Sequence, residues 1–222
     1  DDDITLSGQL SGNRDSSGIG DAEFFGMLSV HGKPLITEAD MKMRFGSREE
    51  MVTGTGLIGG GEASLTFETS INAAPRLMIV SENAGRVLSG LKVTDSVRGG
   101  KLWLTNIFKG GNFKSYDTTI DLANFRVVEA PLALRAFSVL SLAGLYSLVE
   151  GDGTAFRRGN AVLETRGPIV KISSIRAGGE AVGVTMLGVF DRITKKVDVS
   201  GNLVPVNQIS KIIGGLPVVG DL

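Results

Sequence analysis

The chain has 222 residues, with 23 lysines and arginines against 24 aspartates and glutamates, one histidine and no cysteine. The balanced charge is spread along the chain, which excludes the basic stripe of a nucleic-acid-binding protein and a charged tail. The lack of cysteine excludes a disulfide scaffold, a thiolate zinc site and cysteine catalysis. Hydrophobic residues make up 42% of the chain, too many for a disordered segment.

Glycine is the most unusual part of the composition. It supplies 31 of the 222 residues, roughly twice its ordinary usage, while proline supplies 6. Glycine at this level beside alternating apolar residues indicates many strands joined by tight turns and bulges. We therefore expect a mainly β fold with a few helices. Residues 1–222 form one segment, expected to be cut from a longer chain, with a sub-boundary near residues 71–76.

The first third of the chain alternates between apolar and polar residues, as half-buried strands do. Strands are predicted at residues 4–10, 22–31, 39–45, 52–58, 62–70 and 76–80. Serine, asparagine, aspartate and glycine at residues 11–18 predict a loop. Three glycines at residues 59–61 predict a hairpin turn between two of these strands.

Three strand–helix–glycine units follow at unequal spacing. Ser81 stands where an N-cap would, which predicts a helix over residues 82–91. Pro131 stands at the first turn of a second helix, over residues 131–149, and a third is expected at residues 207–213. Between and after these helices, strands are predicted at residues 101–106, 118–128, 159–165, 169–175, 181–190 and 196–203.

The apolar helix over residues 131–149 admits two interpretations. Its uninterrupted apolar run is shorter than the roughly 20 residues that a membrane-spanning helix needs. It is therefore either a buried core helix or an amphipathic helix that rests on lipid.

The sequence predicts no catalytic residue, no metal ligand and no cofactor. His31 lies in a V-H-G-K-P turn without the partners of a metal or catalytic site. No serine stands in a G-x-S-x-G motif. The glycines of residues 56–63 lack the phosphate-loop spacing, and those of residues 151–153 lack the calcium-loop spacing. We expect a protein that is not an enzyme.

Eleven apolar side chains mark one face of each of several strands. They are Met41, Met43, Phe45, Leu65, Phe67, Leu102, Leu104, Ile120, Leu122, Val197 and Val199. Two interpretations fit them: the core of an ordinary two-sheet sandwich, or the concave side of a curved sheet that is lined for acyl chains.

Three stretches in the later part of the chain resemble a known family. The first is S-E-N-A-G-R-V-L-S-G-L at 81–91, followed by V-R-G-G-K-L at 97–102. The second is N-F-R-V-V-E-A-P-L-A-L-R-A-F-S-V-L-S-L-A-G-L at 124–145, followed by E-G-D-G-T-A-F at 150–156, and the third runs from V-P to P-V-V-G at 204–220. In this order, over about residues 76–222, they resemble the C-terminal region of the AsmA-like family of Gram-negative envelope proteins.

The resemblance implies a curved, antiparallel-rich sheet that forms a "β-taco"-like groove and is capped by amphipathic helices. It implies a periplasmic location, with an inner-membrane anchor outside this segment. The implied ligand is a phospholipid or another acyl chain that moves between the inner and outer membranes during outer-membrane biogenesis, and the eleven apolar residues would line its groove. The alternative is a periplasmic scaffold that docks an envelope protein through its apolar helices, with Phe137, Leu140 and Leu145 as docking residues.

Overall fold

The computed structural model describes residues 4–110, 112–128, 153–180 and 182–205. Within them the chain forms thirteen strands and one short helix. In chain order they are β1 (Ile4–Arg14), β2 (Gly20–Val30), β3 (Lys33–Phe45), β4 (Glu49–Ile58), β5 (Gly61–Ser70), β6 (Ala73–Ser81), α1 (Ala84–Gly90), β7 (Val97–Arg98), β8 (Lys101–Lys109), β9 (Asn112–Val127), β10 (Thr154–Arg166), β11 (Ile169–Gly179), β12 (Val182–Asp191) and β13 (Val197–Pro205). The expectation of a mainly β fold is confirmed.

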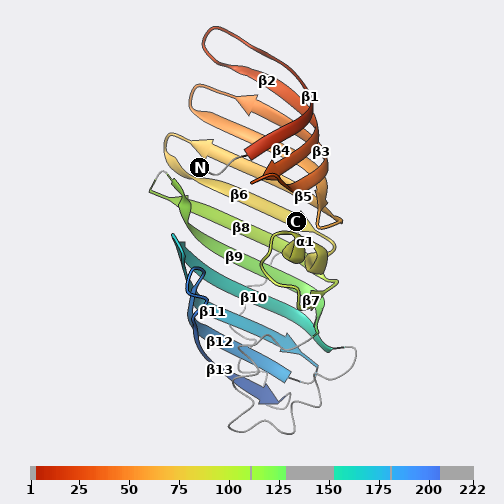
Figure 1. Cartoon of the computed structure of the whole chain (residues 1–222), viewed down its shortest axis with the longest axis vertical. Helices are drawn as coiled ribbons and strands as arrows, with labels where there is room; N and C mark the ends of the chain where they lie inside the picture. Colours follow the sequence, from red (N-terminus) through yellow and green to blue (C-terminus); the bar gives the residue numbers. More distant parts are fainter. Residues whose placement is uncertain (1–3, 111, 129–152, 181, 206–222) are drawn as a thin grey trace.

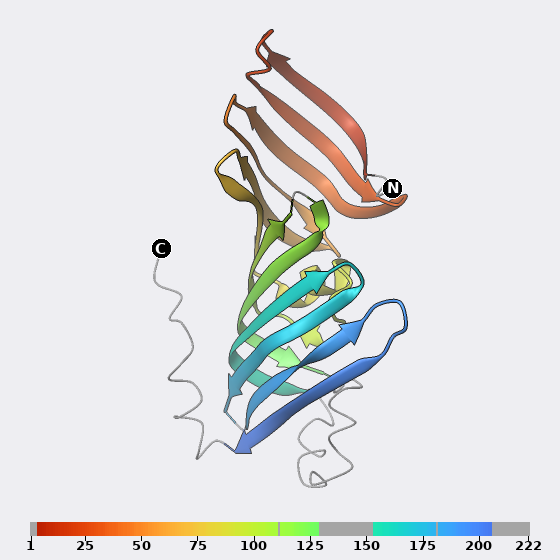
Figure 2. The same cartoon turned by 90° about the vertical axis from the view of Figure 1, so that its left-hand side faces the viewer.

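The strands form a single sheet in which neighbours in the chain are neighbours in space. The order runs from β1 to β13 with antiparallel pairing throughout, and only the two-residue strand β7 lies off this path, beside β9. The sheet curls but does not close, so β1 and β13 are its two edges (Figures 1 and 2). The predicted curved antiparallel sheet is therefore present.

Two-residue turns connect several of the strands. His31 and Gly32 join β2 to β3 with φ values of 50° and 70°, and Gly59 and Gly60 join β4 to β5 with φ values of 59° and 75°. Turns with two positive φ values match the right-handed twist of the flanking strands, which is why glycine is so abundant here. The hairpin predicted at residues 59–61 is confirmed.

The pairing register places apolar residues on one face of the sheet, which we call the inner face. Residues that pair directly across an antiparallel ladder lie on the same face. One line of such pairs crosses the whole sheet, and we call it the central row. It consists of Leu10, Phe24, Met41, Gly54, Leu65, Ile79, Leu104, Ile120, Ala161, Ile175, Met186 and Gly201. No member of the row carries a polar side chain.

The opposite, outer face carries most of the charged side chains of the strands, beside exposed apolar ones such as Val80, Leu187 and Val189. Ion pairs join neighbouring strands there, with nitrogen–oxygen distances of 3.0 Å for Arg76–Glu68, 2.7 Å for Arg166–Asp117 and 3.1 Å for Lys171–Glu164. Exposed pairs of this kind contribute at most about 1 kcal/mol each.

Glycine on the inner face permits the tight curl. A Cβ atom placed on Gly54 would lie 2.3 Å from the carbonyl oxygen of Asp40 on the neighbouring strand β3. Bending a sheet toward one face brings the side chains of that face together, and glycine relieves the crowding. The curl at β3 and β4 therefore depends on the missing side chain.

A residue of β9 in the left-handed region precedes an extra aromatic ring on the inner face. Asn124 has a φ of 53°, and after it the ring of Phe125 stacks on Phe156 with centroids 5.4 Å apart. The ring of Phe125 lies over Gly159, where a Cβ atom would be 2.8 Å from its Cζ atom. Both phenylalanines are buried. Simple alternation along β9 would have pointed Phe125 outward.

The single described helix begins later than predicted. Asn83 is the N-cap of α1, and its Oδ1 atom accepts a hydrogen bond from the Arg86 amide at 3.2 Å. The prediction of Ser81 as N-cap is wrong, because Ser81 ends β6 and its hydroxyl donates to the Glu62 carbonyl oxygen at 2.5 Å. Val87 is buried in the core that the inner face forms. The helix covers one end of that face and does not extend along it.

Other sequence predictions need smaller corrections. The loop expected at residues 11–18 is shorter, because β1 continues to Arg14, and the strand expected at 118–128 starts at Asn112. The expected sub-boundary near residues 71–76 falls at the β5–β6 turn, across which the sheet is continuous. The helices expected at 131–149 and 207–213 lie outside the described residues, so capping of the sheet by amphipathic helices is not confirmed.

Candidate functional site

The structure places all eleven predicted apolar residues together on the inner face. Each either belongs to the central row or is two or four positions along its strand from a member of it. Met41, Leu102, Leu104 and Ile120 are buried, Met43, Phe45, Leu65, Phe67, Leu122 and Val199 are half-buried, and Val197 is exposed. The prediction that these residues share one surface holds in the described part of the chain.

The two-sheet sandwich is wrong for the described residues. They contain one sheet, and the only other element among them is α1, a helix of seven residues. The inner-face side chains pack into one cluster that includes Val87 and Leu88 of α1. The apolar face is therefore the concave lining of one curled layer.

Several inner-face residues were missed by pattern reasoning. They are Phe24, Ile36, Ile79, Phe125, Phe156 and Val184, all buried. Phe24 and Ile79 follow plain alternation and could have been found. Ile36 and Ala39 both point inward because Glu38, at φ 52°, forms a bulge between them. No alternation pattern predicts a bulge of this kind.

An aromatic cluster occupies the inner face near one border of the sheet. The ring of Phe108 lies 6.3 Å from Phe67, 5.0 Å from Phe113 and 5.8 Å from Tyr116, measured between centroids. Phe67 was predicted as a site residue and the other three were not. The cluster extends the apolar lining from β5 to the β8–β9 turn.

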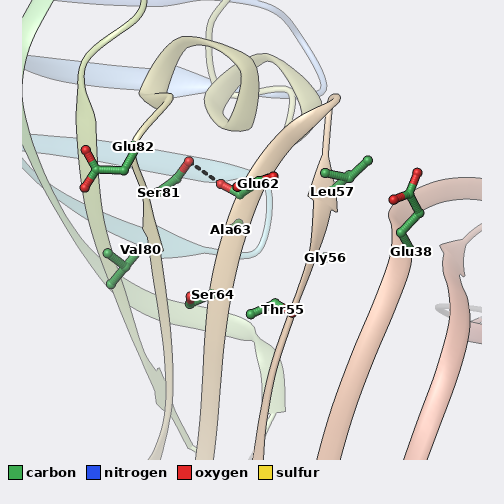
Figure 3. Close-up of a pocket in the computed structure, with 10 residues that line it drawn as sticks. All are labelled: Glu38, Thr55, Gly56, Leu57, Glu62, Ala63, Ser64, Val80, Ser81 and Glu82. Atoms are coloured by element: carbon green, nitrogen blue, oxygen red, sulfur yellow. Dashed lines mark hydrogen bonds between the residues drawn. The ribbon is translucent and has the colours of Figure 1, made fainter.

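One depression lies on the outer face, over β3 to β6. It has a volume of 550 Å³ and is lined by Glu38, Thr55, Gly56, Leu57, Glu62, Ala63, Ser64, Val80, Ser81 and Glu82 (Figure 3). The Glu82 carboxylate pairs with Lys101 at 2.9 Å, and the Ser81 hydroxyl donates to a backbone carbonyl oxygen. Two polar side chains of this depression are therefore already bonded to neighbouring strands.

A second depression, of 480 Å³, lies over β11–β13 on the outer side. Its lining includes Lys171, Leu187 and Asp198. In the described part of the chain, no three histidine, cysteine, aspartate or glutamate side chains are grouped so that they could hold a metal ion. The structure thus gives the inner face, rather than either depression, as the candidate site.

Asp117 is the most strongly engaged carboxylate near the aromatic cluster. A hydrogen bond from Arg166, at 2.7 Å, holds the pKa of Asp117 below its ordinary value of 3.8. Lys109, at 3.3 Å, lowers this pKa further, while partial burial of Asp117 opposes the shift. The negative charge of Asp117 is therefore retained on the outer face, away from the apolar lining.

Two groups of residues from the sequence analysis remain to be placed. His31 is exposed in the β2–β3 turn, as the sequence indicated. The predicted docking residues Phe137, Leu140 and Leu145 lie outside the described residues. Among the helical residues that the structure describes, none forms an apolar stretch of the length needed to traverse a bilayer.

Comparison with known proteins finds no matching family model, no similar curated protein and no similar solved structure. The class of the protein is therefore defined by the fold of its described residues: one open, curled antiparallel sheet with an apolar inner face. Membership of the AsmA-like family stays a prediction from the motifs of the sequence.

Proposed function

We propose that the protein is a non-enzymatic segment that holds the acyl chains of phospholipids on its inner face. In this proposal it belongs to an AsmA-like envelope protein that carries phospholipid between the inner and outer membranes. The observation that supports it is the central row, which crosses twelve strands without one polar side chain.

The dimensions of the row suit an extended hydrocarbon chain. Strands lie about 4.8 Å apart, so the row runs for a length on the order of 50 Å. Each methylene group removed from water contributes about 0.8 kcal/mol. The buried members of the row pack on one another, so the ligand would lie along half-buried residues such as Met43, Leu65 and Leu122.

The proposal predicts little headgroup specificity. Charged side chains such as Lys42, Glu68 and Arg76 stand on the outer face, in cross-strand pairs. A phospholipid headgroup would therefore remain in water while its acyl chains contact the inner face. Binding should follow acyl-chain length more than headgroup type.

The remaining parts of the proposal come from the family resemblance. The segment would lie in the periplasm, with the inner-membrane anchor elsewhere in the full chain and amphipathic helices over the ends of the groove. The scaffold alternative depends on helix residues outside the described part of the chain, and no structural observation favours it.

Native mass spectrometry with lipid extraction tests the proposal. The protein purified from a bacterial host should carry phospholipid, and Leu65→Glu, which places a charge in the central row, should lose it. Thr66→Glu is the matched control, because Thr66 is the next residue of β5 and faces outward among Thr53 and Met78. A folded wild-type protein that carries no lipid and takes up none from added phospholipid would overturn the proposal.

A further inference from the structure

Three consecutive turns form a basic border with exposed apolar tips. The β8–β9, β10–β11 and β12–β13 turns lie on the same side of the sheet, opposite α1 (Figure 1). We call their side chains the basic rim. Its basic members are Lys109, Lys114, Arg166, Arg192, Lys195 and Lys196, and its apolar members are Phe113, Ile169, Ile193 and Val197.

Hydrogen bonds between the turns hold the rim together. The Gly167 amide donates to the Lys114 carbonyl oxygen at 2.9 Å, which joins the first two turns. The Arg192 amide donates to the Pro168 carbonyl oxygen at 3.0 Å, and its guanidinium donates to the Tyr116 hydroxyl at 3.0 Å. The three turns thus form one connected surface.

Two acidic groups beside the rim, Asp117 and Asp191, are bonded within it, and the six basic members outnumber these two together with Asp198. Asp117 is bonded to Arg166 and Lys109, as described above. The Asp191 carboxylate accepts hydrogen bonds from the amides of Ile193 at 2.8 Å and Thr194 at 3.2 Å. The rim therefore presents a net positive charge to an approaching surface.

Large apolar side chains project from this positive border into water. The exposed fraction is 62% for Phe113 and 76% for Ile193. They stand at the tips of separate turns beside lysine and arginine, and Phe113 also packs against the ring of Phe108. Exposed aromatic and aliphatic side chains beside basic residues are the groups that insert into the interface of an anionic bilayer.

The rim is also continuous with the inner face. Phe113 contacts Phe108, whose ring contacts Phe67 on the lining itself. A protein partner would leave this continuity unexplained, whereas a bilayer would place its acyl chains at the start of the apolar path. This continuity selects a lipid surface over an acidic protein as the occupant.

We propose that the basic rim is a docking surface for an anionic phospholipid bilayer, with Phe113 and Ile193 inserted below the headgroups. This docking goes beyond the acyl-chain binding proposed above and does not depend on it. Loss of one activity can therefore be separated from loss of the other.

Co-sedimentation with vesicles tests the docking, using the full chain and vesicles of phosphatidylglycerol mixed with phosphatidylcholine. Reversal of two rim charges in Lys195→Glu/Lys196→Glu should weaken binding about tenfold or more, and raised salt should have a similar effect. The control Lys33→Glu/Lys92→Glu makes the same change in net charge at positions outside the rim and should bind as the wild type does.

Fluorescence locates the insertion. In a Trp103→Phe background, the tryptophan emission maximum of Phe113→Trp should shift to shorter wavelength when the mixed vesicles are added. The emission maximum of Ile71→Trp, at an exposed turn outside the rim, should not shift.

Three results would overturn the proposal: equal binding to pure phosphatidylcholine vesicles, equal loss of binding in both charge variants, or capture of polyaspartate without vesicle binding. Leu65→Glu should still bind vesicles even if it carries no lipid.

Discussion

Thr118 donates its hydroxyl hydrogen to the Oδ1 atom of Asn106 across 2.6 Å, and the two residues pair directly on the inner face. Thr118 is buried and Asn106 is half-buried. The bond satisfies the Thr118 hydroxyl donor and the Asn106 side-chain oxygen on a surface that is largely apolar.

Breaking this pair from one side should destabilise the protein more than removing it altogether. Thr118→Val leaves the Asn106 amide without its partner, which should lower the free energy of unfolding by about 1–2 kcal/mol. The double variant Asn106→Leu/Thr118→Val should recover most of that loss. Urea unfolding of the three proteins measures the difference, and equal destabilisation of both variants would contradict the interpretation.

Shortening a buried side chain of the inner face should lower the free energy of unfolding far more than shortening an exposed one on the outer face. Leu102 has an exposed fraction of 0%, so Leu102→Ala should lower the free energy of unfolding by about 2–5 kcal/mol. Leu187 points outward and is 56% exposed, so Leu187→Ala should change it by no more than about 0.5 kcal/mol. Urea midpoints provide the comparison, and similar values for the two variants would refute the assignment of faces.

A side chain at Gly54 should oppose the curl. Gly54→Ala brings a methyl group against the Asp40 carbonyl oxygen, and this overpacking should cost about 1–3 kcal/mol. Thr53→Ala, one residue earlier in β4 and on the outer face, is the control. Thermal unfolding by circular dichroism measures both, and an unchanged midpoint for Gly54→Ala would show that the curl does not depend on this glycine.

The ion pairs of Asp117 should contribute to the acid sensitivity of the fold. Its pKa in the folded protein lies below 3.8, so its stabilisation is fully present above that value and is lost as pH falls through the folded pKa. Asp117→Asn and Arg166→Met should both flatten the decline of stability below about pH 4, where Glu164 and Asp191 still contribute. Urea unfolding across pH measures the slope, and an unaltered slope in both variants would exclude this role.

Alternation and turn chemistry were enough to predict most strands and the shared face of the eleven apolar residues. They could not predict that the face lines one curled layer, because a sandwich core and a concave lining have the same pattern along each strand. Phe125 and Ile36 were missed because the left-handed conformation of Asn124 and the bulge at Glu38 reverse the alternation locally. The N-cap was misplaced because Ser81 bonds to the neighbouring strand, a long-range contact that helix propensity does not contain.

The basic rim was not predicted either. Its members come from three turns spread over residues 109–197, and each turn looks like an ordinary polar connection. Only the antiparallel order of the strands brings these turns to one border. The same order explains why charge counted along the whole chain gave no sign of a positive surface.

Because each main strand pairs only with its neighbours in the chain, the sheet can be lengthened or shortened one hairpin at a time. Inserting one hairpin between two existing strands would add two strand spacings, about 10 Å, and would leave every other pairing register intact. Because a hairpin adds an even number of strands, the following strands would keep both their direction and their apolar side. Duplication or loss of hairpins is therefore a simple evolutionary route by which related proteins could span gaps of different width.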